Sequence, residues 1–77
     1  MLETRTIALA GRRTSVALEP PFWAALAEIA AREGVTLAAL CAEVERDRGA
    51  LGRAAALRLY ALGYFEATGS GAASGPV

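Results

Sequence analysis

Polar and apolar or β-branched residues alternate over residues 3–18, with the period of two that is typical of a β-strand. The alternation changes phase at Ala10-Gly11, so the apolar set occupies odd positions before these residues and even positions after them. The side chains expected to share one face are Ile7, Leu9, Thr14, Val16 and Leu18. This segment therefore predicts a β structure with one face directed toward a core and the other toward solvent.

Two backbone arrangements explain the phase change at Ala10-Gly11. A two-residue turn would pair residue 9 with residue 12 and residue 7 with residue 14 in a hairpin. A bulge at Gly11 would give the same change within one bent strand. Because alanine is a poor residue for the positive φ angle of a tight hairpin turn, the bulge is slightly favoured. The principal strand is then expected over residues 12–18.

Two amphipathic helices are expected next, because apolar residues recur three and four positions apart. The first should run over residues 20–33, since proline is tolerated in the first turn of a helix and Gly34 favours a left-handed stop. Its apolar stripe begins at Phe22, and Trp23 lies beside that stripe. The second helix should run over residues 36–48, with Thr36 as its N-cap.

A third helix is expected over residues 53–66 and is apolar on nearly all sides. Such a helix has to be buried on more than one side, which in so short a chain indicates a second subunit. The Gly-, Ser- and Ala-rich residues 67–77 are expected to be disordered. The domain is therefore expected to span residues 1–66.

The size of the chain also favours a shared core. A chain of 77 residues buries only about 60% of the surface that its unfolded form exposes, and such domains usually need a disulfide, a metal or a partner chain. One cysteine and no histidine leave the partner chain, so we expect a homodimer. The residues expected in its core are Val16, Leu18, Phe22, Trp23, Leu26, Leu40, Val44, Leu57 and Tyr60.

Charge and reactive residues narrow the function classes. The formal net charge is zero, which disfavours nucleic-acid binding over the whole surface, but residues 1–18 carry three arginines against one glutamate. No enzyme, metal or cofactor is expected, since histidine and lysine are absent and Cys41 falls on an apolar stripe. Neither a signal peptide nor a membrane span is evident, so a cytoplasmic protein with no membrane partner is expected.

Several short motifs indicate a family. Arg13-Thr14-Ser15, Leu18-Glu19-Pro20 and Phe22-Trp23, together with an apolar segment from Leu51 to Phe65, resemble the small ribbon-helix-helix domain family of bacteria, within the Arc/MetJ-like superfamily. The resemblance covers residues 4–66. It implies a mainly α fold with one N-terminal β ribbon, a ribbon-helix-helix dimer, and an additional C-terminal helix.

The same resemblance implies a dimeric DNA-binding protein, a transcriptional regulator or repressor. One strand from each subunit would form a ribbon that enters the major groove of double-stranded DNA. The residues implied to face DNA are Arg12, Arg13, Ser15, Ala17 and Thr36, with Arg12 at the turn and Thr36 at a helix start contacting phosphate. The alternative is a protein-interaction module, antitoxin-like or an adaptor, that engages a partner protein without DNA.

Overall fold

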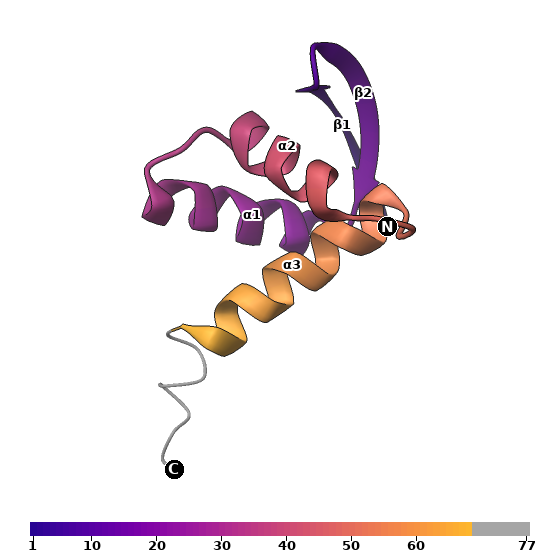
Figure 1. The fold of residues 1–77 in the computed structure, drawn as a ribbon. Coiled ribbons are helices and arrows are strands. Elements are labelled where there is room, and N and C mark those ends of the chain that lie inside the picture. Colours follow the sequence, from indigo (N-terminus) through magenta and orange to yellow (C-terminus); the bar gives the residue numbers. More distant parts are fainter. Residues whose placement is uncertain (69–77) are drawn as a thin grey trace.

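The computed structural model describes residues 1–68, which form a two-stranded antiparallel ribbon followed by three helices (Figure 1). The elements are β1 (Glu3–Leu9), β2 (Arg12–Leu18), α1 (Pro20–Glu33), α2 (Leu37–Asp47) and α3 (Arg53–Ala67). The expected mainly α fold with an N-terminal ribbon and an additional C-terminal helix is confirmed. The disorder expected for residues 67–77 concerns a segment that from residue 69 onward lies outside the described residues.

The ribbon is a hairpin of one chain, and the bulge favoured by the sequence is wrong. Leu9 pairs with Arg12, and both turn residues have left-handed backbone angles, with φ of 52° at Ala10 and 78° at Gly11. Alanine in this conformation costs roughly 1–2 kcal/mol. The turn is nevertheless formed because it places the apolar side chains of both strands on one face. The resemblance implied one strand from each subunit, whereas here β1 supplies the partner of β2.

The turn yields a stability prediction. Asparagine tolerates the left-handed region, and Asn-Gly is a favoured pair for a two-residue hairpin turn. We expect Ala10→Asn to raise the free energy of unfolding by about 0.5–1 kcal/mol, part of the strain that alanine carries there. Urea denaturation followed by circular dichroism measures the change. A lower midpoint than that of the wild type would show that the turn is not the one described.

The hydrophobic core lies between the inward face of the ribbon and the three helices. The buried side chains form one contiguous cluster, and no polar or charged residue among residues 1–68 is buried. Of the nine expected core residues, seven are buried within the single chain, and Phe22 and Tyr60 are only partly buried. β1 packs on α2, and β2 contacts α3. The ribbon is therefore held in place by helices of its own chain.

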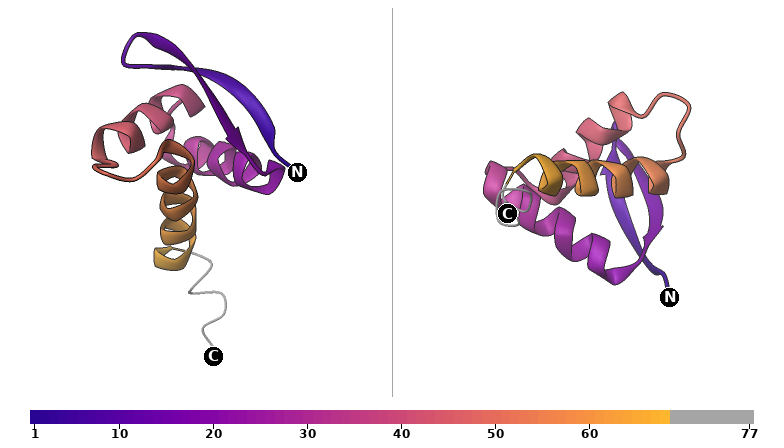
Figure 2. Two further views of the ribbon diagram at one scale, coloured as in Figure 1. Left: turned by 90° about the vertical axis from the view of Figure 1, so that its right-hand side faces the viewer. Right: turned by 90° about the horizontal axis from the view of Figure 1, so that it is seen from below.

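Trp23 fixes the base of the ribbon to α1. Its side chain is 1% exposed, and its indole N–H donates a hydrogen bond of 2.8 Å to the backbone carbonyl of Glu3. The guanidinium of Arg5 lies 5.0 Å from the centre of the indole ring. Both views in Figure 2 show the N-terminus beside the start of α1. The rest of the expected stripe is buried, but its first member differs: Trp23 enters the core, and Phe22 lies at its margin.

The helix ends follow their capping residues. Gly34 ends α1 with a φ of 71°, and its N–H donates to the carbonyls of Ala30 and Ala31. The hydroxyl of Thr36 accepts the N–H of Ala39 at 3.0 Å, which confirms Thr36 as the N-cap of α2. Among residues 1–68, no helix has the length and apolar character needed to cross a bilayer.

Candidate nucleic-acid interface

The pairing register defines an outward face of the ribbon, directed away from the core. Residues opposite each other in an antiparallel pair share a face, and Val16 and Leu18 lie on the buried one. The outward face comprises three opposed pairs, Thr4 with Ala17, Thr6 with Ser15, and Ala8 with Arg13. All six are exposed except Ala17, which is partly buried. Arg13 is therefore the one long side chain on a surface of small residues.

Only half of this face follows from the sequence. Arg13, Ser15 and Ala17 are expected to point outward, and the structure places all three on the outward face. Thr4, Thr6 and Ala8 are absent from the expected site, because a single bent strand does not bring them beside β2. These three residues could have been identified from the hairpin alternative, in which residue 7 pairs with residue 14 and β1 lies beside β2.

Arg12 belongs to the opposite face from Arg13. It pairs with Leu9 next to the turn, where its side chain is exposed despite the inward parity. The two neighbouring arginines thus lie on opposite faces of the ribbon at its tip. We define the ribbon tip as residues 9–13. Arg13 belongs to the outward face, whereas Arg12 has the inward parity and is exposed next to the turn.

The ion pairs of the chain leave the ribbon tip positively charged. The paired arginines and their partners are Arg5 with Glu3, Arg32 with Glu28, Arg48 and Arg53 with Glu45, and Arg58 with Glu19. Within residues 1–68, Arg12, Arg13 and Arg46 have no carboxylate within 4.0 Å. A chain of zero net charge therefore concentrates uncompensated positive charge at the tip.

Two further arginines strengthen this basic end. Arg48 and Arg53 both donate hydrogen bonds of 3.0 Å to one oxygen of Glu45, and they surround a small cavity together with Leu9 at the ribbon tip. Burial favours the protonated carboxyl of Glu45, but the hydrogen bonds from Arg53 and Arg48 outweigh it, so the pKa of Glu45 is lowered. Two cations thus share one carboxylate. The sequence does not single out these arginines, because they follow the acidic segment 43–47.

A bidentate ion pair connects the ribbon to the third helix. Arg58 of α3 donates from Nε and Nη2 to the two carboxylate oxygens of Glu19, at 2.8 and 3.1 Å. The hydrogen bond from Arg58 lowers the pKa of Glu19, which lies between β2 and α1. The same guanidinium lies 5.9 Å from the centre of the Phe22 ring. α3 thus contacts the junction through which the ribbon is attached to the helices.

Thr36 is not part of the ribbon surface. It precedes the first turn of α2. The ribbon tip lies near a later part of that helix, because Leu9 lines the small cavity together with Cys41 and Val44. The first helical hydrogen bond uses the N–H of Leu40, and the cap uses the N–H of Ala39. The N–H groups of Leu37 and Ala38 come before these, and N–H groups at a helix start attract anions. The structure therefore provides Thr36 as a helix start, separate from the outward face.

Cys41 offers no nucleophile for chemistry. Its side chain is 2% exposed, and burial raises the pKa of the thiol to about 11. The thiol is therefore protonated at neutral pH, and the thiolate is the form that reacts. Its position in the core agrees with the apolar stripe on which the sequence places it.

A two-stranded ribbon with an arginine on its outward face, followed by two helices joined through a glycine turn, defines a ribbon-helix-helix domain. The chain belongs to this family: the family model described as ribbon-helix-helix domain matches residues 2–65. No curated protein and no solved structure matches the chain. The family is in general one of DNA-binding regulators, and its domains are typically non-enzymatic.

Proposed function

We propose that this protein is a DNA-binding transcriptional regulator that reads duplex DNA through the outward face of its ribbon. The observation that carries the proposal is the position of Arg13 as the one long side chain on an outward face of small residues. The major groove of B-DNA is wide enough for a two-stranded ribbon. Small residues allow the ribbon to approach the bases closely, and an arginine there reaches guanine.

Four of the six residues of the outward face have a chemical counterpart in the groove. The guanidinium of Arg13 fits the O6 and N7 acceptors of guanine in a bidentate contact. The hydroxyls of Ser15 and Thr6, opposite each other in the ribbon, can donate to or accept from base edges. Ala17 offers only a methyl group, which suits contact with the methyl group of thymine.

The backbone of DNA is contacted from the margins of the ribbon in this proposal. Arg12 lies next to the turn and has no carboxylate partner among the described residues, so it is available to a phosphate. The free N–H groups at the start of α2, beyond Thr36, suit a second phosphate. Such contacts fix position and supply affinity without reading sequence.

The test of this proposal is a chemical-shift map of the isotopically labelled protein with duplex DNA from upstream of its own coding sequence. We expect the largest amide shifts at Thr4, Thr6, Arg13 and Ser15, with smaller shifts at residues 36–38. Shifts confined to α1 and α3, or no shifts at low salt, would contradict the ribbon as the reading surface.

We propose further that the protein acts as a homodimer, which pairs two ribbons on neighbouring half-sites. The surface that best suits a second copy lies between α1 and α3. It is a shallow apolar groove of about 170 Å³ that includes Phe22, Leu62 and Phe65. Two ion pairs lie beside it, Arg58 with Glu19 and Arg32 with Glu28. Every residue that lines the groove is apolar, so a two-fold interface there brings no charged lining residues together.

Dimerisation predicts that stability depends on protein concentration, because dissociation accompanies unfolding. The melting temperature should rise over a hundredfold increase in concentration, and Leu62→Arg should abolish the rise. Leu51→Arg, another exposed leucine outside that groove, is the matched control. A concentration-independent transition together with a monomer mass by sedimentation would contradict the dimer.

A further inference from the structure

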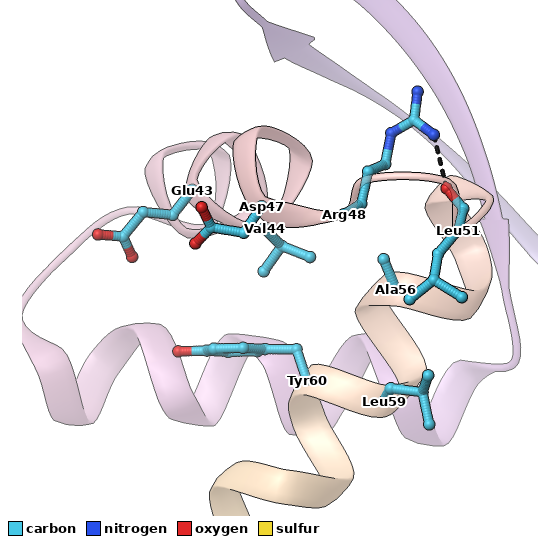
Figure 3. Close-up of a pocket in the computed structure, with 8 residues that line it drawn as sticks. All are labelled: Glu43, Val44, Asp47, Arg48, Leu51, Ala56, Leu59 and Tyr60. Carbon is cyan, nitrogen blue, oxygen red and sulfur yellow. Dashed lines mark hydrogen bonds between the residues drawn. The ribbon is translucent and has the colours of Figure 1, made fainter.

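A second groove lies between α2 and α3 and differs from the first in its charge (Figure 3). Its volume is about 290 Å³, and its apolar lining includes Val44, Leu59 and Tyr60. Leu59 in this lining is 56% exposed. None of its lining residues belongs to the ribbon, so an occupant of this groove leaves the outward face free.

One side of the rim of this groove carries two carboxylates, Glu43 and Asp47, whereas Arg48 in the lining is bonded to Glu45 and to the backbone carbonyl of Leu51. Glu43 and Asp47 are four residues apart on α2, so they share one side of the helix, and Figure 3 shows them above the ring of Tyr60. Neither has an arginine within 4.0 Å in the described part of the chain. Burial raises the pKa of Tyr60, and the charges of Glu43 and Glu33 raise it further, in agreement with a negative potential at this position.

The size of the groove favours side chains over a metabolite. Pockets for small molecules usually measure about 300–1,000 Å³ and enclose most of their ligand. At about 290 Å³ this groove is at the lower limit of that range, and two of its lining residues, Leu51 and Leu59, are exposed to solvent. It suits one or two protruding side chains of a helix laid along it, an established mode of peptide recognition.

The charge of the rim favours a partner other than a second copy. In a two-fold dimer the same patch occurs on both sides of the interface, so pairing through this groove would bring Glu43 and Asp47 of both copies into one interface. Like charges brought together in this way oppose association. The side chains that complement this rim are arginine and lysine, whose aliphatic stems can lie on leucine and tyrosine while their cations meet the carboxylates.

We propose that the groove between α2 and α3 binds a basic amphipathic helix of another protein. An apolar side chain of that helix would lie between Val44 and Leu59. An arginine or lysine one turn away would lie over Tyr60, between Glu43 and Asp47. The protein would then bind DNA with its ribbon and a basic partner with this groove.

Two synthetic helical peptides of ~16 residues provide the test, each long enough for about four helical turns. Both carry leucines at helical spacing, and they differ only in having arginine or glutamate at the flanking positions. We expect the arginine peptide to shift amide signals at residues 43–47 and 56–60 of the full chain, and to bind at least ~10-fold more tightly, about 1.4 kcal/mol. The double substitution Glu43→Gln and Asp47→Asn should remove this preference.

Glu66→Gln provides the matched control, since Glu66 is an exposed carboxylate on α3 that does not line the groove. It should leave peptide binding unchanged, and every one of these variants should retain wild-type affinity for DNA. Equal affinity for the two peptides, binding unaffected by the double substitution, or shifts mapped elsewhere would overturn the proposal. Conversion of a dimer to a monomer by Leu59→Arg would also overturn it, because a second copy would then occupy the groove.

Discussion

Trp23→Ala is expected to abolish the folded state or to leave it populated only in part at room temperature. The side chain is almost entirely buried, and truncation of a core tryptophan to alanine costs about 3–5 kcal/mol. It also removes the hydrogen bond from the indole N–H to the carbonyl of Glu3, worth about 1 kcal/mol. A chain of this size has a total stability of about 4–12 kcal/mol, so the loss is comparable to the whole.

Phe22→Ala is the matched control for this prediction. The neighbouring aromatic side chain is only partly buried within one chain, so in the monomer its truncation should cost roughly 0.8–1.5 kcal/mol, about half the transfer free energy of a fully buried residue. Circular dichroism with urea measures both variants without relying on tryptophan fluorescence. If Phe22→Ala is the more damaging substitution, then the core is assembled on the stripe that the sequence favours.

Arg13→Ala is expected to weaken binding to specific DNA by about 10- to 100-fold while the fold remains intact. A bidentate contact between arginine and guanine discriminates by roughly 1–3 kcal/mol, and no ion pair or core contact of the described chain depends on Arg13. Affinity for unrelated duplexes should change much less, because Arg13 reads bases in this proposal. The measurement is fluorescence anisotropy with specific and unrelated duplexes of equal length.

Arg12→Ala should have a different effect, although the two residues are adjacent. A contact with phosphate contributes equally on every sequence, so affinity should fall for all duplexes together. The slope of log affinity against log salt should become shallower by roughly 0.9 for each phosphate that the variant no longer neutralises. If the two variants behave identically, or if neither alters binding, then the opposite orientations of these side chains have no role in recognition.

Much of the fold follows from the pattern of the chain, because its strongest signals are local. Proline in the first turn, Gly34 and the hydroxyl of Thr36 mark helix ends without reference to tertiary structure. The turn at Ala10 cannot be predicted from local preferences. These preferences disfavour alanine with positive φ, but the burial of side chains on both strands outweighs them. The choice between Phe22 and Trp23 likewise depends on the direction of approach of β1, which periodicity alone does not contain.

The candidate site could be predicted only in the part that lies on a single strand. Parity along residues 12–18 identifies Arg13, Ser15 and Ala17, but Thr4, Thr6 and Ala8 join them only through pairing across the turn. Ion pairing is also beyond the sequence, since Arg58 meets Glu19 across 39 positions. Without those pairs the net charge of zero argues against DNA binding, whereas with them two of the three arginines that have no ion pair in the described residues lie at the ribbon tip.

The central claim is that the ribbon binds duplex DNA and reads its sequence. The most direct measurement is a titration of the wild-type protein, at several salt concentrations, against the duplex from upstream of its coding sequence and against a scrambled duplex of the same composition. We predict tighter binding to the natural duplex at every salt concentration, with log affinity falling linearly as log salt rises. Equal affinity for both duplexes, or no binding even at low salt, would contradict the claim.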